Sequence, residues 1–490
     1  MPSTFPRPSA HSSMSMLMQI AALAVAFGRA GAANEESCEF VRPPMGWNSY
    51  DSSAGSGTGT NESTALAAAE FVTKHLRSAG YEFIVLDAGW FGPYDGSSMA
   101  LDEYGRLVPD SKRHPSSTGG VGFRYLSDVV HGLGLKFGFW IMGGIPRDAV
   151  KRKSPIENTN YTADEAADLT DKRVCSWQPG FVYGSRLNSD GSLHPAAIAY
   201  YDSIARLYKS WGVDFIKMDC VFGGDYYRGK QDMEQFSSSM NGTGQEYLPS
   251  LSPGSDSGMA SIARSFAEAQ HPGQPTMARM TSDFWDSWTS LYGHFEIAAK
   301  AANFTGGQFF PDLDMLPLGW VSPYEEQARY SKLTLAEARS LMTLMVMARA
   351  PLMWGGAASE ERANATTVGL LSNTEVLGVA RSSCLNRQLR RDSDDVAIWA
   401  AQGQSPQDKF LAFINLGENV TSAEVDLSDP GIPGAALPWP AKAGRYVARD
   451  LWLGSDFPVT GGKVVARLLP HSALLLRIRP APGAFDLLVA

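Results

Sequence analysis

The segment Trp211-Gly-Val-Asp-Phe-Ile-Lys-Met-Asp-Cys220 decides the fold class of this chain. An apolar strand with Val213, Phe215 and Ile216 ends abruptly in Lys217 and Asp219. Side chains alternate along a β-strand, so Lys217 and Asp219 fall on the same face. In a parallel (β/α) barrel the carboxyl ends of the strands form the active site. The segment therefore predicts a barrel strand that presents Asp219 as a candidate nucleophile.

A second segment, Gln274 to Asp283, has the same layout. A short apolar strand is followed by Arg279 and Asp283, before a helix start rich in aromatic residues. Glycoside hydrolysis needs two carboxylic acids, one as nucleophile and one as acid/base. An aspartate after a strand is also a common helix cap or turn residue, so each acid alone has a structural explanation. Together they predict a glycosidase with Asp219 and Asp283 as its catalytic pair.

The alternation of strands and helices extends over residues 43 to 365, which is typical of βα units that close a parallel sheet. Beyond residue 370, short apolar runs are separated by Gly, Pro and Asp turns, which indicates antiparallel β-structure. We expect an α/β (β/α)8 TIM barrel at residues 40–368 and a C-terminal antiparallel β-sandwich at residues 378–485. The expected barrel strands are Met45 to Asn48, Phe83 to Asp87, Leu135 to Met142, Val213 to Asp219, Glu246 to Ser250, Thr276 to Met280, Gly307 to Phe310 and Ala350 to Trp354.

Other expected strand ends carry groups that suit a sugar. Flat aromatic faces bind the C–H faces of pyranoses, and carboxylates accept hydrogen bonds from hydroxyl groups. Each such residue alone is also explained as a core tryptophan, a helix cap or a turn residue, but their joint appearance at strand ends favours a sugar site. The candidate substrate-binding residues are Trp47, Asp87, Trp90, Trp140, Lys217, Ser252, Arg279 and Asp314.

Composition limits the partners. The 490 residues carry a net charge of -9 without basic clusters, which argues against nucleic acid. Residues 1–33 resemble a secretory signal peptide, with an apolar run from Met14 to Phe27 and small residues near Ala32; a signal anchor is the alternative. We expect a secreted protein, extracellular, in the cell wall, or in a lysosome or vacuole, with no stable membrane association after signal cleavage. Six glycosylation sequons fit this route: Asn61, Asn160, Asn241, Asn303, Asn364 and Asn419.

The four cysteines lack the spacing of metal ligands, and an oxidising compartment favours one or two disulfides. A bridge from Cys175 to Cys220 would pin the loop that follows Asp219, with a free buried thiol as the alternative. No cluster of histidines suggests a metal-dependent hydrolase, so we expect neither a metal nor a cofactor.

Seven motifs make the chain resemble glycoside hydrolase family 27 over residues 43 to 360. This family includes α-galactosidases, α-N-acetylgalactosaminidases, β-L-arabinopyranosidases and isomalto-dextranases. The motifs are Pro44–Tyr50, Leu86–Trp90, Leu133–Gly138, Gly212–Cys220, Arg279–Asp283, Pro311–Leu316 and Ala350–Met353. The resemblance implies a (β/α)8 barrel, a C-terminal β-sandwich and a retaining double displacement. By motif position Asp219 would be the nucleophile and Asp283 the acid/base, with Asp87, Lys217, Arg279 and Asp314 around the sugar.

The resemblance places hydrolysis of terminal α-D-galactosyl residues, from oligosaccharides or glycoconjugates, first among the activities, by a monomer or homodimer. Three departures from the α-galactosidase pattern put galactose in doubt: Ala88 replaces the second of two adjacent acids, Ser252 replaces an acid, and Trp140 replaces a tyrosine. The segments Tyr247–Gly254 and Phe309–Trp320 are most similar to members related to β-L-arabinopyranosidase. The alternatives are therefore another family 27 specificity or, outside enzymes, a catalytically inactive secreted carbohydrate-binding protein.

The resemblance also sets expectations for protonation. Lys217 should keep Asp219 ionised. Aromatic neighbours should desolvate Asp283 enough for it to hold a proton, unless Arg279 faces it.

Overall fold

A computed structural model describes residues 38, 40–57, 59–93, 97–170, 174–175, 177–222, 226–253, 259–324, 326–392, 395–405, 407–433 and 446–481. The expected signal segment, residues 1–33, lies outside these residues. None of the helices within the described ranges is both long and apolar enough to cross a bilayer.

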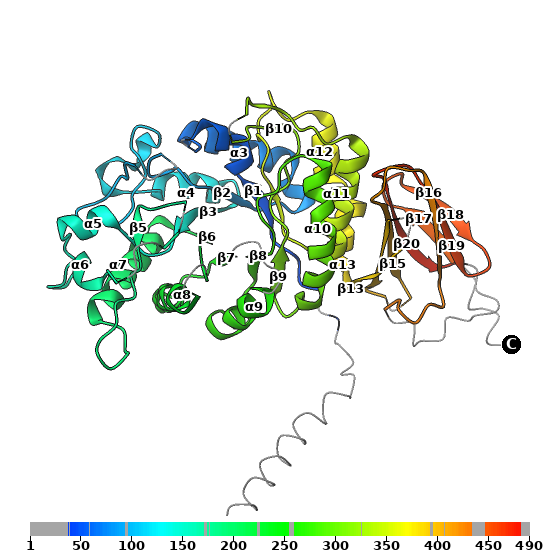
Figure 1. Ribbon diagram of the computed structural model, residues 1–490. Helices are drawn as coiled ribbons and strands as arrows, with labels where there is room; N and C mark the ends of the chain where they lie inside the picture. Colours follow the sequence, from blue (N-terminus) through cyan, green and yellow to red (C-terminus); the bar gives the residue numbers. More distant parts are fainter. Residues whose placement is uncertain are drawn as a thin grey trace, which may run out of the picture. The chain divides into compact units, whose positions relative to one another are not determined.

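Eight parallel strands form the barrel, in the order β12-β1-β2-β3-β6-β7-β8-β9 (Figure 1). A parallel bridge between Leu316, just after β9, and Trp354 of β12 closes the ring. All eight expected strands are present, with β7 and β9 shifted two residues toward the C-terminus. The strands are β1 (Met45–Asn48), β2 (Phe83–Leu86), β3 (Lys136–Met142), β6 (Phe215–Asp219), β7 (Leu248–Ser252), β8 (Thr276–Arg279), β9 (Phe309–Asp312) and β12 (Leu352–Trp354).

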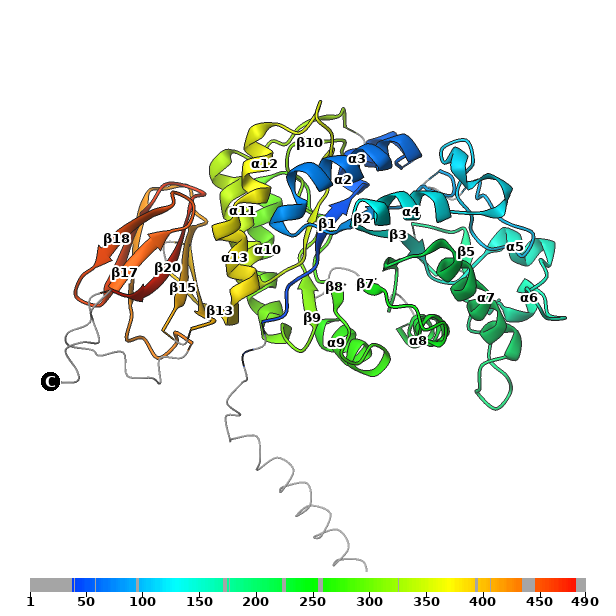
Figure 2. The same ribbon diagram turned by 180° about the vertical axis from the view of Figure 1, so that it is seen from behind.

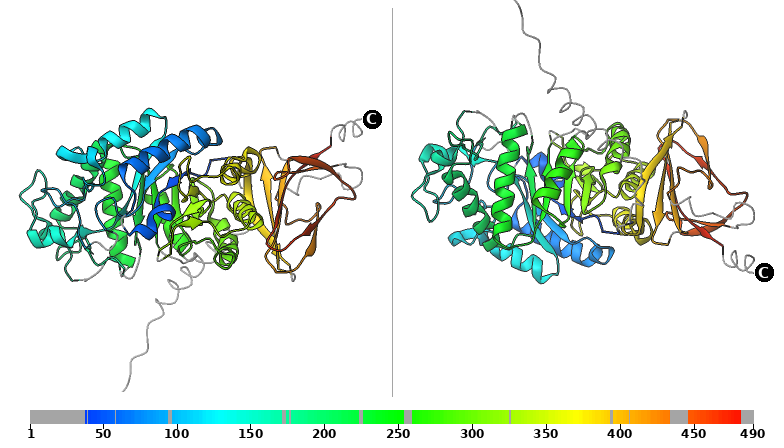
Figure 3. Two further views of the ribbon diagram at one scale, coloured as in Figure 1. Left: turned by 90° about the horizontal axis from the view of Figure 1, so that it is seen from above. Right: turned by 90° about the horizontal axis from the view of Figure 1, so that it is seen from below.

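Helices surround these strands (Figure 3), and local sequence fixes their ends. The Asn61 side chain caps α3 by accepting a hydrogen bond from the Thr64 amide, and Thr334 with Glu337 forms a capping box on α11. Gly212 ends α7 in the left-handed conformation (φ 71°). The helices are α2 (Tyr50–Ser53), α3 (Glu62–His75), α4 (Arg124–Gly132), α5 (Arg147–Arg152), α6 (Ala163–Ala166), α7 (Pro195–Trp211), α8 (Tyr226–Gly242), α9 (Met259–Gln270), α10 (Trp288–Ala301), α11 (Leu335–Ala348), α12 (Ala365–Ser372) and α13 (Thr374–Ser382).

Two-residue strands occur in the loops and pair as β4 (Ile145–Pro146) with β5 (Phe181–Val182) and as β10 (Trp320–Val321) with β11 (Arg329–Tyr330).

Alternation along the strands separates the barrel interior from the layer beneath the helices. Ile216 and Met218 pack in the large core that the helices cover, whereas Phe215 belongs to the interior cluster. The interior cluster comprises Phe83, Val85, Phe215, Leu248, Met277, Phe310, Met315 and Met353. Lys217 and Asp219 share the parity of Phe215, so the interior becomes polar toward the carboxyl ends of the strands. This edge holds the candidate site.

The C-terminal part is a β-sandwich of two antiparallel sheets. One sheet has the order β13-β14-β15-β20-β17-β18, and the other pairs β16 with β19. Their bounds are β13 (Ser383–Arg391), β14 (Val396–Gly403), β15 (Lys409–Asn415), β16 (Thr421–Asp426), β17 (Tyr446–Asp450), β18 (Ser455–Val459), β19 (Lys463–Leu468) and β20 (Ala473–Pro480).

The six-stranded sheet is apolar on both faces. Ile398 and Leu411 belong to the core within the sandwich, whereas Trp399 and Phe410 belong to the core shared with the barrel. Strands buried on both faces read as continuous apolar runs, which explains why β14 and β15 lack polar alternation. The outer face of this sheet packs against α11 (Figures 1 and 2).

Polar contacts reinforce the packing of the sandwich on the barrel. The Trp452 indole donates a hydrogen bond to Thr343 Oγ1 at 3.0 Å, and His471 pairs with Glu337 at 2.9 Å. The His471 ring also stacks on Trp288 of α10, with ring centroids 3.9 Å apart. The barrel and the sandwich thus belong to one compact unit, Phe40–Ala490.

Candidate active site

Asp219 is the last residue of β6, and its carboxylate is held by two donors. The Trp140 indole N–H donates to Oδ2 at 3.0 Å, and the Cys220 amide donates to Oδ1 at 2.8 Å. Trp140 can reach Asp219 because it pairs with Lys217 across β3 and β6 and therefore shares the parity of the interior. The expected disulfide between Cys175 and Cys220 is present, with Cα atoms 5.8 Å apart, and fixes the turn after Asp219. The orientation of this carboxylate is therefore tightly defined.

Lys217 and Asp87 form a buried ion pair beside Asp219. Lys217 Nζ lies 2.8 Å from Asp87 Oδ2, and the two side chains are 13% and 2% exposed. Asn48 Nδ2 donates to the same Asp87 oxygen at 2.9 Å. Burial by itself disfavours the ammonium form of Lys217, but the carboxylates of Asp87 and Asp219 outweigh this and raise its pKa above the ordinary lysine value. Lys217 is thus a fixed cation in the barrel mouth.

Arg279 joins Asp283 to Asp314. Its Nη2 lies 2.9 Å from Asp283 Oδ1 and 2.7 Å from Asp314 Oδ2. Burial raises the pKa of Asp314 to about 6, against the opposing charge of Arg279. The Asp283 side chain is 60% exposed, and its carboxylate faces the Arg279 guanidinium.

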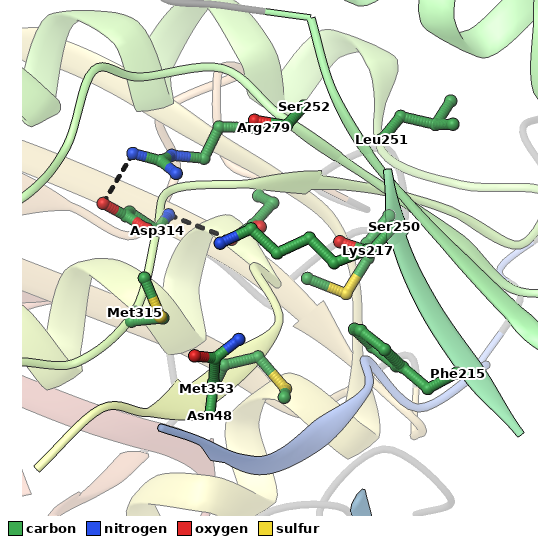
Figure 4. Close-up of a pocket in the computed structure, with 12 residues that line it drawn as sticks. Asn48, Phe215, Lys217, Ser250, Leu251, Ser252, Arg279, Asp314, Met315 and Met353 are labelled. Carbon is green, nitrogen blue, oxygen red and sulfur yellow. Dashed lines mark hydrogen bonds and ion pairs between the residues drawn. The ribbon is translucent and has the colours of Figure 1, made fainter. Parts of the chain in front are cut away.

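A cavity lies beside Lys217, Arg279 and Asp314, and neither Asp219 nor Asp283 is among the residues that line it. Four of the expected substrate-binding residues line it, namely Lys217, Ser252, Arg279 and Asp314. Figure 4 shows the guanidinium of Arg279 bound to Asp314, with the Lys217 ammonium directed toward the same space. The other lining residues are Asn48, Phe215, Ser250, Leu251, Met277, Asp312, Met315 and Met353.

Trp47 and Trp90 pack in the core and do not line this cavity, so the expectation that they contact substrate needs correction. Both side chains are 1% exposed. The Trp47 indole donates to the Gly356 carbonyl, and the Trp90 indole donates to the Trp140 carbonyl. Both rings belong to the core beneath the helices. Trp140 is equally buried but reaches the site through its hydrogen bond to Asp219.

Sequence reasoning missed Tyr50 and Asp51, which begin helix α2 directly after β1. The Lys217 ammonium lies 5.7 Å from the centroid of the Tyr50 ring. Asp51 is 1% exposed, and its Oδ2 has no hydrogen-bond partner within the part of the chain that the structure describes. Burial, followed by the nearby carboxylate of Asp314, raises the pKa of Asp51 well above the ordinary value.

Space for the Asp51 carboxyl comes from Gly355, because a Cβ there would lie 1.8 Å from Asp51 Oδ2. The available signal was position, because Asp51 comes three residues after the end of an expected strand.

The site can bind several vicinal hydroxyl groups at once. Lys217 and Arg279 only donate hydrogen bonds, ionised aspartates only accept them, and Ser252 does both. No group of three or more His, Cys, Asp or Glu side chains in the described ranges is arranged to hold a metal ion. Carboxyl groups arranged beside fixed cations can serve as nucleophile and as acid/base at a polyhydroxylated ring.

Comparison with known proteins agrees with this chemistry. The family model "Alpha galactosidase A" matches residues 181–381, and "Alpha galactosidase C-terminal beta sandwich domain" matches residues 393–478. A GH27 β-L-arabinopyranosidase of Geobacillus stearothermophilus is 34% identical, with a TM-score of 0.79 over 90% of this chain and 97% of that one. The α-galactosidase of Coffea arabica is 24% identical over 442 residues, which are 90% of this chain and 94% of that protein.

A more distant solved structure, α-galactosidase I of Mortierella vinacea, shares the fold at 17% identity, with a TM-score of 0.64 over 91% of this chain and 98% of that one. The barrel, the sandwich and these relatives define a glycoside hydrolase. More narrowly, the chain belongs to glycoside hydrolase family 27, as its motifs predicted.

Proposed function

We propose that this protein is a retaining exo-glycosidase that releases terminal β-L-arabinopyranosyl residues. The observation that carries the proposal is the likeness to the Geobacillus stearothermophilus β-L-arabinopyranosidase, at 34% identity over 90% of this chain. A further structure of that enzyme, in complex with arabinose, is 33% identical. The curated α-galactosidase of Coffea arabica is 24% identical. These figures favour the arabinopyranosidase alternative over the α-galactosidase that the sequence placed first.

The pocket chemistry supports this choice. Ala88 follows Asp87 where the α-galactosidase pattern has a second acid, and its buried methyl group cannot accept a hydrogen bond. L-Arabinopyranose shares the ring stereochemistry of galactose but lacks the hydroxymethyl arm, and therefore has one hydroxyl fewer to bind. A pocket with one acceptor fewer suits the smaller sugar, because a buried hydroxyl without a partner costs binding energy.

In the proposed mechanism Asp219 attacks the anomeric carbon while Asp283 protonates the departing oxygen. The C–O bond to the leaving group breaks as the bond to Asp219 Oδ forms, which gives a glycosyl ester. Asp283, now a base, then takes a proton from water, and the resulting attack releases the sugar with its original anomeric configuration. The two donors on Asp219 hold its carboxylate for attack. The exposure of Asp283 lets it exchange protons with the leaving group and with water.

The second candidate is α-galactosidase activity, which the curated plant relatives favour. A panel of 4-nitrophenyl β-L-arabinopyranoside, α-D-galactopyranoside and N-acetyl-α-D-galactosaminide separates the candidates. We expect the highest kcat/KM on the arabinopyranoside. A higher kcat/KM on the galactoside would replace the first proposal by the second.

The catalytic roles are tested with Asp219→Ala and Asp283→Ala in the presence of azide. Asp219→Ala should lose turnover, and azide in the vacated space should give a glycosyl azide of inverted configuration. Asp283→Ala should still form the glycosyl ester from a substrate with a good leaving group, so azide should give the retained configuration. Unchanged turnover in folded Asp219→Ala, or the reverse assignment of configurations, would overturn the roles.

A further inference from the structure

The segment after Asp283 has an alternating pattern that places one tryptophan beside the candidate acid/base. Phe284 and Asp286 are both 2% exposed. The Phe284 amide donates to Asp314 Oδ2 at 2.6 Å, and Asp286 binds the guanidinium of Arg329 at 2.5 Å. These two residues anchor the segment to the protein, whereas Asp283 is exposed and Trp285 remains partly exposed. Asp283 and Trp285 therefore project on the same side, away from the anchors.

Tyr50 links Trp285 to the sugar cavity. The Trp285 and Tyr50 ring centroids lie 6.1 Å apart with an interplanar angle of 39°, and the Lys217 ammonium lies 5.7 Å from the Tyr50 ring centroid. Lys217 lines the cavity. An aromatic wall thus runs from the cavity, through Tyr50, to Trp285 next to Asp283.

The direction in which the leaving group departs indicates which part of the substrate this aromatic wall contacts. In a double displacement the leaving group departs from the side opposite the nucleophile, and the acid/base protonates it there. A side chain that holds the leaving group must therefore lie on the Asp283 side of the site. Trp285 meets this condition. Trp177, which is 51% exposed, lies on the Asp219 side instead, because its ring packs on Trp140, the residue that binds Asp219.

We propose that Trp285, backed by Tyr50, is the binding platform for the leaving group and that this leaving group is a pyranose. A flat and partly exposed indole offers the surface that the C–H face of a pyranose covers. The inference rests on the proposed two-aspartate mechanism and adds the substrate class: an oligosaccharide in which the terminal sugar is attached to another sugar ring.

Two substrates that share a glycone test the platform. One is a disaccharide, and the other is the corresponding glycosyl fluoride, whose leaving group is too small to touch an indole. Trp285→Ala should lower kcat/KM for the disaccharide about tenfold, equivalent to about 1.4 kcal/mol, and should leave kcat/KM for the fluoride within about twofold. Trp285→Phe, which keeps a flat face, should recover most of the loss.

Trp177→Ala is the matched control, since it removes an exposed tryptophan from the Asp219 side. It should change kcat/KM for the two substrates by the same factor. Equal losses on both substrates in Trp285→Ala would overturn the inference, because a folding defect lowers both rates by the same factor. A defect in the acid role of Asp283 also spares the fluoride, but it lowers kcat for the disaccharide, whereas loss of the platform raises KM. A loss confined to kcat would therefore also overturn the inference. An unchanged disaccharide rate would also overturn it.

The glycone is the one that the aryl glycoside panel selects. The proposed arabinopyranosyl specificity therefore fails on the panel itself, whereas the platform fails only on the ratio between disaccharide and fluoride.

Discussion

Removal of the Lys217 ammonium should destabilise the folded protein, because it leaves the Asp87 carboxylate buried without its cation. In Lys217→Met, Asp87 stays 2% exposed and loses a cation at 2.8 Å. Breaking a buried ion pair costs about 3–5 kcal/mol. Asp87 keeps hydrogen bonds from Asn48 and from the Ala88 amide, both at 2.9 Å, so we expect the lower end, about 3 kcal/mol.

The assay is the free energy of unfolding from urea titration, followed by tryptophan fluorescence. Because the pKa of Lys217 is raised, its contribution is fully present below the ordinary lysine value of about 10.4 and is lost only as the pH rises through the raised value. The loss in Lys217→Met should therefore be constant between pH 6 and 9.

The double variant Lys217→Met/Asp87→Asn provides the decisive comparison. Neutralising both partners removes the stranded charge, so the double variant should be more stable than Lys217→Met alone. Lys74→Met is the surface control: its ion pair with Glu360 has side chains 66% and 63% exposed, and no measurable loss is expected. The reasoning is refuted if Lys217→Met unfolds like the wild type, or if the double variant is no more stable than the single one.

Three further changes test the site. Asp51→Asn should stabilise the protein increasingly as the pH rises from about 4 to 7. The raised pKa of Asp51 makes the folded wild type retain a proton that the unfolded chain releases above about pH 3.9. Thermal midpoints measure the difference between variant and wild type, and a pH-independent difference would contradict the reasoning. Gly355→Ala should cost about 1–3 kcal/mol through its clash with Asp51, and Asp51→Ala should relieve that cost; additive losses in urea titrations would exclude the clash. Trp140→Phe should lower kcat/KM about 10- to 150-fold by removing the 3.0 Å hydrogen bond to Asp219; an unchanged value would show that this bond does not serve catalysis.

The fold could be predicted because each barrel strand is a short apolar run between segments with helical periodicity. The carboxyl end of the strand with Lys217 and Asp219 was located to the residue, because its polar end breaks the apolar run, whereas the strand begins at Phe215, two residues later than expected. The disulfide between Cys175 and Cys220 was also predicted. The position of Cys220 directly after the strand end that carries Asp219 suggested this bridge, although the sequence also allowed a free buried thiol.

The aromatic residues of the site were harder to predict, because a tryptophan next to a strand end can point either into the barrel or toward the helices. Trp47 pairs with Ile84, a residue of the core beneath the helices, and so it points away from the cavity. Its neighbour Asn48 pairs with Val85 of the interior cluster and lines the cavity. Tyr50 and Asp51 follow the strand on a short helix, where no strand alternation reveals the direction of a side chain.

The two-faced sheet of the sandwich has a practical meaning for protein engineering. Helix α11 is buried over nearly its whole length, from Ala338 to Ala348, because the barrel occupies one side and the sheet with Trp399 and Phe410 occupies the other. A barrel fragment truncated before Ser383 would expose the apolar face of this helix to water and should aggregate. Chimeras between relatives should therefore exchange the helix and the sheet together, because their side chains form one interface.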